Sequence, residues 1–206
     1  MKGSAICPHV NGEKMRHNWS DAAINWPHAT VLEEWELGGS YKTGSTEIWT
    51  QQVVAALLAA SFANSVLELG CYTGATSVWL CVTLQRMGGG RYIGVDLEPE
   101  RQQATVNRLA KLHLPDVQWE VLNANSFSVL RSLPARSVEF AWVDDDHTPE
   151  HVAEELELLC RPTLRETAVM APSGIVTMHD VFGDGTMPGL AGVCASYHGS
   201  SLRVPR

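Results

Sequence analysis

Apolar residues recur in short runs that alternate with helical patterns over residues 46–178. Apolar positions at helical spacing predict helices over residues 46–62, 74–87, 99–112, 126–133 and 149–160. Short runs rich in Val, Ile and Leu predict strands over residues 65–69, 91–95, 117–122, 138–143 and 174–178. This alternation predicts an α/β fold with right-handed crossovers and a parallel sheet covered on both faces.

Composition and charge narrow the classes of partner. Of 206 residues, 45% are hydrophobic, which is enough for one core. Lys and Arg number 15 against 23 Asp and Glu, so we expect neither a nucleic acid nor a membrane surface as partner, because both require a basic face. No apolar run approaches the length of a membrane span, and the first residues lack the core of a signal peptide. The five cysteines form no C-x-x-C pair, so we expect free thiols and a cytoplasmic protein.

Polar or charged residues follow every predicted strand. They occur at positions 70–74, 96, 123–126, 144–147 and 179–180. The carboxyl ends of parallel strands share one edge of the sheet, and ligands bind outside that edge. Because all five strands end this way, the sequence predicts one polar binding site there.

The turn after the first strand has a glycine at each end, Gly70 and Gly74, with Tyr72 between them. It is similar to a dinucleotide-binding loop, but Tyr72 stands where a middle glycine would let pyrophosphate approach the backbone. A nucleoside without phosphates tolerates that side chain. Asp96, at the end of the next strand, can accept hydrogen bonds from both hydroxyls of a ribose. The pattern therefore indicates an adenosine-type ligand and disfavours a nucleotide-dependent oxidoreductase.

Four motifs resemble those of class I S-adenosylmethionine-dependent methyltransferases. They are Val-Leu-Glu-Leu-Gly-Cys-Tyr-Thr-Gly at 66–74, Gly-Val-Asp-Leu-Glu-Pro-Glu at 94–100, Ala-Trp-Val-Asp-Asp-Asp-His at 141–147 and Gly-Ile-Val-Thr-Met-His-Asp-Val at 174–181. The first is similar to the metal-dependent O-methyltransferases of the catechol and caffeoyl-CoA type, and the last two are closer to sugar and antibiotic O-methyltransferases. The resemblance covers residues 46–182 and implies a Rossmann-like, doubly wound fold.

The resemblance also implies which residues bind S-adenosylmethionine. They are Glu68, Gly70, Tyr72, Gly74, Asp96, Asn125, Ser126 and Asp144. The glycine loop would hold the methionine part of the cofactor, with Glu68 near its polar end. Asp96 would hold the ribose hydroxyls, and Asn125 and Ser126 would contact the adenine.

A divalent metal is expected beside the cofactor. Asp144, Asp145 and Asp146 are consecutive, so their charges repel one another unless water or a cation offsets them. With Asp180 from the neighbouring strand they suit Mg²⁺, Mn²⁺ or Ca²⁺. The resemblance makes Asp144 and Asp180 metal ligands and leaves His179 open as a third, because the catechol-type pattern has Asp-Asn there. The alternative for Asp145 and Asp146 is that they lie in water, one of them capping the next helix, and for Asp145 this is the expectation.

The expected chemistry is in-line transfer of the sulfonium methyl group to a substrate hydroxyl. A metal ion lowers the pKa of that hydroxyl and fixes its angle, and a base, either Asp146 or His147, removes its proton. His147 and His151 also fit the H-x-x-E-H pattern of zinc peptidases. Pro149 between them predicts the start of a helix rather than its interior, so we reject a zinc-peptidase site.

The two ends of the chain depart from the alternating pattern. Residues 1–45 are polar and irregular, and we expect an N-terminal extension to a methyltransferase domain at 46–206. This extension either forms a lid that contacts the acceptor or covers the edge of the sheet. Pro and Gly interrupt residues 181–206, so we expect an abbreviated C-terminal end. Since a bare sheet edge invites pairing, we also expect a homodimer.

The sequence therefore predicts a metal-dependent O-methyltransferase that acts on a hydroxyl of a small molecule. The alternative is a non-catalytic S-adenosylmethionine-binding regulatory or interaction protein, which would keep the cofactor pocket without turnover.

Overall fold

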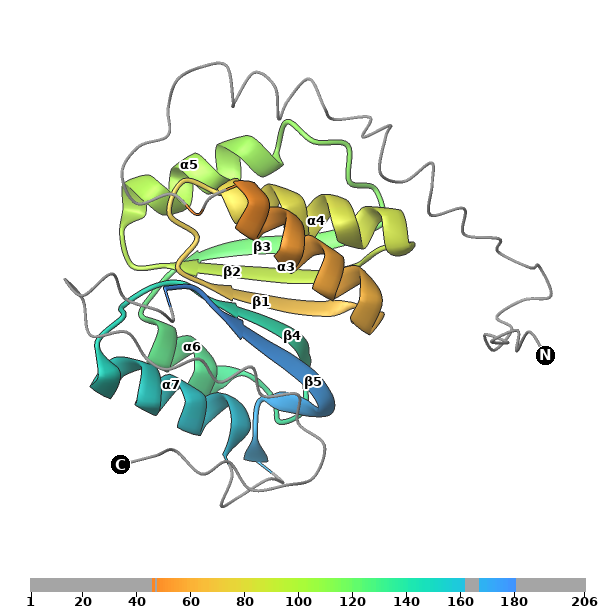
Figure 1. Cartoon of the computed structure of the whole chain (residues 1–206). Coiled ribbons are helices and arrows are strands. Elements are labelled where there is room, and N and C mark those ends of the chain that lie inside the picture. Colours follow the sequence, from red (N-terminus) through yellow and green to blue (C-terminus); the bar gives the residue numbers. More distant parts are fainter. Residues whose placement is uncertain (1–45, 47, 162–166, 181–206) are drawn as a thin grey trace, which may run out of the picture. The chain divides into compact units, whose positions relative to one another are not determined.

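Five parallel strands form one sheet in the described part of the computed structural model, in the order β3-β2-β1-β4-β5 (Figure 1). They are β1 Ser65–Leu69, β2 Gly90–Asp96, β3 Val117–Asn123, β4 Val138–Val143 and β5 Met170–Met178. The described residues are 46, 48–161 and 167–180, all within the compact unit Thr43–Arg206. The strand order reverses between β1 and β4, which makes a topological switch point at the carboxyl edge of the sheet.

Helices cover both faces of the sheet (Figure 1). One face carries α3 Ile48–Ser61, α4 Ala75–Met87 and α5 Pro99–Leu109, and the other carries α6 Ser126–Ser132 and α7 Pro149–Cys160. The expected doubly wound, Rossmann-like α/β class is confirmed. Within the described residues, no helix is both long and apolar enough to cross a membrane.

Strand β5 starts earlier than the sequence pattern predicts, at Met170 instead of residue 174. From the sequence alone, a turn is the expected structure for Pro172, Ser173 and Gly174, because Pro and Gly interrupt most strands. In the structure all three lie inside β5. The pairing of β5 with β4 shifts in register between Val138 and Phe140, and this irregularity accommodates the segment. Pro is tolerated here because β5 is the last strand of the described sheet, where a missing N–H breaks no central ladder.

The core lies along the two central strands, β1 and β4. Leu67, Leu69 and Phe140 are fully buried, and Trp142 is nearly so, as expected for strands covered by helices on both faces. Backbone hydrogen bonds continue the ladder past the strand ends: Asp144 N–H donates to the Leu69 carbonyl at 2.8 Å and His179 N–H to the Val143 carbonyl at 3.0 Å. The first polar residues after these strands are therefore held as rigidly as the strands themselves.

Several predictions fall on residues that the structure does not describe. The N-terminal extension at 1–45 and the abbreviated end at 181–206 lie outside the described residues, so the lid, the domain boundary and the homodimer stay predictions. The three described cysteines, Cys71, Cys81 and Cys160, are buried and free, which agrees with the expectation of free thiols.

Candidate functional site

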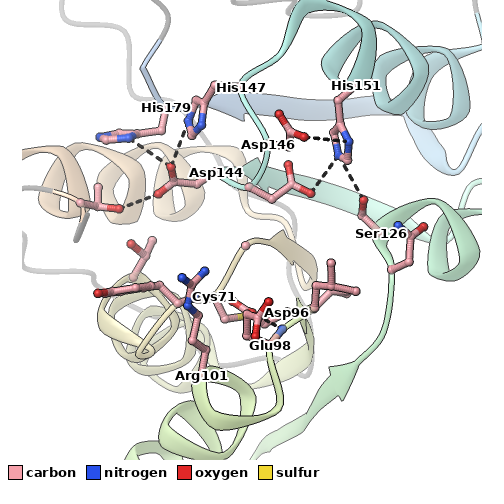
Figure 2. A pocket seen from close by; sticks show the side chains of 18 of the residues that line it. Cys71, Asp96, Glu98, Arg101, Ser126, Asp144, Asp146, His147, His151 and His179 are labelled. Carbon is pink, nitrogen blue, oxygen red and sulfur yellow. Dashed lines mark hydrogen bonds and ion pairs between the residues drawn. The ribbon is translucent and has the colours of Figure 1, made fainter. Parts of the chain in front are cut away.

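A cavity of about 760 Å³ opens at the carboxyl edge of the sheet (Figure 2). This volume is in the range of small-molecule sites. Residues that follow all five strands line it, so the predicted convergence of the strand ends is correct. The residues from the predicted site that line the cavity are Gly70, Tyr72, Asp96, Asn125, Ser126, Asp144, Asp146, His147, His179 and Asp180. Glu68 and Gly74 do not line it.

The two glycines of the first loop serve different contacts. Gly70 has a φ of +84°, and a Cβ placed on it would lie 2.1 Å from the Asp144 carbonyl oxygen. The absence of a side chain thus lets the loop pack against the end of β4. Gly74 also has a φ of +84° and is the N-cap of α4, where a Cβ would press on Thr105 of α5 at 3.0 Å. Its role is helix packing rather than a wall of the cavity.

Asp96 ties the glycine loop to the end of β2. The Tyr72 N–H donates to Asp96 Oδ2 at 2.7 Å, and the Glu98 N–H donates to Oδ1 at 2.9 Å. Arg101 of α5 stacks over the Tyr72 ring, 4.9 Å from its centroid, and both residues line the cavity. Each carboxylate oxygen of Asp96 keeps a second acceptor position, so it can still receive ligand hydroxyls.

Glu68 lies beneath the loop and not at the cavity wall. Its side chain is 1% exposed and accepts hydrogen bonds from Ser77 Oγ at 2.7 Å and from the Tyr92 hydroxyl. Burial raises the pKa of Glu68 to about 8, although these two hydrogen bonds oppose the rise. The structure therefore places Glu68 in a buried polar cluster between β1, β2 and α4, behind the residues that line the cavity.

Replacing Glu68 with glutamine is expected to flatten the pH dependence of stability. The folded-state pKa of about 8 lies above the ordinary value of 4.5, so the folded protein holds an extra proton between these values. Wild-type unfolding free energy therefore falls as pH rises through this window, by about 2–3 kcal/mol between about pH 5.5 and 7.5. Urea unfolding at both pH values should show this fall reduced in Glu68→Gln. The exposed Glu120→Gln should keep the wild-type slope, and an unchanged slope in Glu68→Gln would contradict the prediction.

Asp144, His147, His179 and Asp180 form one group of potential metal ligands, here called the Asp144 cluster (Figure 2). The ligand atoms that they offer all lie within 4.8 Å of one another. Asp144 Oδ1 is 3.1 Å from His179 Nδ1 and 3.5 Å from His147 Nε2. Thr46, at the start of the described chain, donates its hydroxyl to Asp144 Oδ2 at 2.7 Å. The structure thus brings together the three predicted metal ligands and His147.

The charges of the Asp144 cluster depend on one another. Burial alone would raise the pKa of Asp144, but its contacts with His147, His179 and Thr46 outweigh burial, and the pKa is lowered. The nearby Asp144 carboxylate in turn raises the pKa of His147 against the effect of burial. His147 Nε2 is buried and lies 3.5 Å from both Asp144 and Asp180, too far for a full hydrogen bond to either. An unsatisfied nitrogen between two carboxylates suits a cation or a transferable proton.

Asp146 and Asp145 point in different directions from the loop after β4. Asp146 is 53% exposed, and its Oδ1 accepts from the Thr148 N–H at 2.9 Å, which lowers its pKa. This contact is a local turn before α7, whose N-cap is Thr148 without a side-chain hydrogen bond, so the expected cap by Asp145 or Asp146 is not formed. Asp145 is 20% exposed and lies 3.2 Å from His151 Nε2, so the expectation that it lies in water is wrong. Its side chain faces His151 of α7.

The sequence analysis considered His151 only in the rejected zinc-peptidase pattern and did not single out Glu155; both residues belong to α7. The four-residue spacing of His151 and Glu155 puts them on one face of the helix, and this spacing was the available signal. Ser126 Oγ at the start of α6 lies 3.4 Å from His151 Nε2, while the Asn125 side chain caps α6 by accepting from the Ser128 N–H. Helix α7 begins at Pro149, which confirms that His147 precedes the helix and that no zinc-peptidase motif forms.

A family model described as a methyltransferase domain matches residues 67–181, more than half of the chain. The match includes β1 from Leu67 onward and the other four strands. It also includes every described residue that lines the cavity except Thr46. No curated protein matches this sequence.

Several solved structures share the fold. The SAH-bound methyltransferase PaMTH1 of Podospora anserina is 13% identical, with a TM-score of 0.62 over 89% of this chain and 76% of that chain. The O-methyltransferase TomG of Streptomyces achromogenes, in complex with SAM, is 17% identical, with a TM-score of 0.54 over 79% and 70%. The O-methyltransferase of Bacillus cereus, in complex with SAH, is 16% identical, with a TM-score of 0.57 over 81% and 72%. At these identities the likeness establishes the fold.

Proposed function

Because this chain belongs to the methyltransferase-domain family, we propose that it is an S-adenosylmethionine-dependent, divalent-metal-dependent O-methyltransferase that acts on a hydroxyl of a small molecule. The observation that carries the proposal is the shared cavity: Asp96 and the Asp144 cluster line the same 760 Å³ space. A donor nucleoside and an acceptor can therefore be held side by side at one edge of the sheet.

The residues around the glycine loop fit a methyl donor without phosphates. Gly70 allows close packing of the loop, Tyr72 occupies the position where a pyrophosphate would need a bare backbone, and Asp96 keeps acceptor positions for a ribose. Asn125 and Ser126 line the cavity and would contact the adenine. The solved structures of TomG, PaMTH1 and the Bacillus cereus enzyme hold SAM or SAH, which supports the same donor here.

The Asp144 cluster fits a divalent ion. Two carboxylates and two imidazoles lie within 4.8 Å, and the buried His147 nitrogen lacks a full hydrogen bond. Asp144, Asp180 and His179 would hold the ion, and the presence of an imidazole ligand favours Mn²⁺ over Mg²⁺ or Ca²⁺. A bound ion supplies Lewis-acid polarisation of an acceptor hydroxyl.

His147 is better suited than Asp146 to accept the proton of the acceptor. Its pKa is raised by Asp144, so its protonated form is stabilised where it faces two carboxylates. Asp146 is exposed, and the Thr148 N–H lowers its pKa, which makes it a weaker base. A well-placed general base contributes typically about 10²–10⁴-fold to rate.

A titration and an assay test the proposal. Calorimetry with S-adenosylhomocysteine, NAD and ATP should give heat with S-adenosylhomocysteine; heat with NAD alone would overturn the proposal. Consumption of the methyl donor should then be followed against catechols, sugars and phenols, with and without EDTA. Turnover that EDTA abolishes and Mn²⁺ restores is expected. Donor binding without turnover on any acceptor would favour a non-catalytic binding protein.

Replacing Asp96 with alanine is expected to weaken S-adenosylhomocysteine binding by about 10- to 100-fold, since a hydrogen bond to a charged group contributes about 1.5–3 kcal/mol. The reason is loss of the ribose acceptor together with the contacts that hold Tyr72 and Glu98. Calorimetry measures the affinity. The exposed Glu120→Gln on β3, paired with Arg91, should bind as the wild type does. Wild-type affinity in Asp96→Ala would remove Asp96 from the donor site.

A further inference from the structure

A second group of potential ligands lies outside the Asp144 cluster. It consists of Asp145 after β4 and of His151 and Glu155 on α7, and it is here called the Glu155 cluster. The ligand atoms that its members offer lie within 4.8 Å of one another. Figure 2 shows His151 with Asp146 and Ser126 on the side of Asp144 opposite to His147 and His179. Apart from Ser126, which would contact the adenine, the proposed methyl transfer assigns no role to Asp145, His151 or Glu155.

His151 Nε2 faces more oxygen atoms than one nitrogen can serve. Asp145 Oδ2 and Glu155 Oε1 each lie 3.2 Å away, and Ser126 Oγ lies 3.4 Å away. A single ring N–H can donate one good hydrogen bond, so two of these oxygens remain unpaired. Ligand atoms around one metal ion at bonds of about 2.0–2.2 Å stand about 3.0–3.4 Å apart, which matches these separations.

Three carboxylate oxygens of the Glu155 cluster are buried without a hydrogen bond among the described residues. Glu155 is 0% exposed, and neither of its oxygens has a hydrogen-bond partner among the described residues. Asp145 Oδ1 is also buried without one. Unpaired buried carboxylates are costly and are normally paired, metal-bound or protonated. Burial raises the pKa of Glu155, and the charge of Asp145 adds to the rise.

Both ring nitrogens of His151 face carboxylates. Its face packs against Phe127, with ring centroids 4.5 Å apart. Nε2 faces the Glu155 cluster, while Nδ1 lies 3.8 Å from Asp146 Oδ2 on the opposite side. The Nδ1 contact is too long for a hydrogen bond, so Nε2, which faces the Glu155 cluster, is the nitrogen that a metal ion would use.

We propose that Asp145, His151 and Glu155 form a second metal site, which binds a divalent first-row transition-metal ion such as Mn²⁺, Co²⁺ or Zn²⁺. One imidazole and two carboxylates favour these ions over Ca²⁺ and Mg²⁺, which take oxygen ligands. The Ser126 hydroxyl lies close enough to complete the site. A metal here links the end of β4 to α7 and α6 and braces the wall of the cavity formed by Asn125 and Ser126.

Counting bound ions tests this site without reference to activity. The full chain carrying Asp144→Ala, which disables the Asp144 cluster, is dialysed against Mn²⁺ or Zn²⁺ and its bound metal is measured. One ion per chain is expected. Adding Glu155→Gln should weaken that binding at least about 10-fold, the effect typical of damage around a metal site. The matched control, Glu150→Gln, lies exposed in the first turn of the same helix and should keep the ion.

A proton shared by the carboxylates is the competing occupant. In that case the Asp144→Ala chain binds no more metal than its Glu155→Gln derivative, and the proposal is wrong. Asp145→Asn provides a second variant if Glu155→Gln does not fold, and it should lose the ion in the same way. The His151 ring resonances in NMR give a local readout: Zn²⁺ should shift them in Asp144→Ala and in the Glu150→Gln control, and unshifted resonances would overturn the site. These outcomes do not depend on whether the chain transfers methyl groups.

Discussion

Replacing Asp144 with alanine is expected to lower metal-dependent methyl transfer by at least about 100-fold, because metal polarisation contributes several kcal/mol to the transition state. Asp144 is the centre of its cluster: His147, His179 and Thr46 all contact its carboxylate. Removing it takes away one ion ligand and leaves two imidazoles without their common partner. It also removes the cause of the raised pKa of His147, so the proposed base loses proton affinity.

Donor consumption at saturating Mn²⁺ measures this effect once an acceptor is found. Calorimetry with S-adenosylhomocysteine provides the control, because Asp96 and the glycine loop are unchanged and donor binding should be retained. Glu150→Gln, an exposed acidic residue near the same loop, should keep full turnover. Wild-type turnover in Asp144→Ala would exclude Asp144 from the reaction, whereas loss of donor binding would show that its main role is to hold the cavity together.

Replacing Gly70 with alanine is expected to lower the unfolding free energy by about 4 kcal/mol, the sum of left-handed strain and overpacking at about 1–3 kcal/mol each. The added Cβ would lie 2.1 Å from the Asp144 carbonyl oxygen and 2.8 Å from the Asp145 Cα. These are backbone atoms in a strand end held by the Asp144 N–H bond to the Leu69 carbonyl. They cannot move away as a flexible side chain could.

Gly88→Ala is the matched control for this prediction. Gly88 has a φ of +103°, and a Cβ placed there meets nothing within 4 Å. It should show the strain alone, about 1–2 kcal/mol. Urea unfolding of both variants separates the two effects. Equal losses in Gly70→Ala and Gly88→Ala would mean that the end of β4 yields and that the loop is less tightly packed than the structure indicates.

The resemblance to class I methyltransferases is confirmed by the family match over residues 67–181. The site residues that the resemblance implies do not all line the cavity. Ten of the predicted site residues line the cavity, because the backbone positions of strand ends follow from topology alone. Glu68 does not, since a strand directs alternate side chains to opposite faces and the sequence does not reveal that Ser77 and Tyr92 surround that position. Its buried, raised pKa is a property of that packing.

The sequence by itself determined the element order, the parallel sheet and the edge that carries the site. Hydrophobic periodicity indicates which faces of the helices and strands are buried. The right-handedness of the crossover connections then leaves few possible sheet topologies. The tertiary structure decided which side chains meet. Thr46 reaches Asp144 across 98 residues, and Asp145, which lines the cavity, contacts His151 and lies near Glu155. Such contacts depend on how β4, α3 and α7 pack, and no local pattern encodes the direction of a loop side chain. The two candidate metal sites follow from that packing.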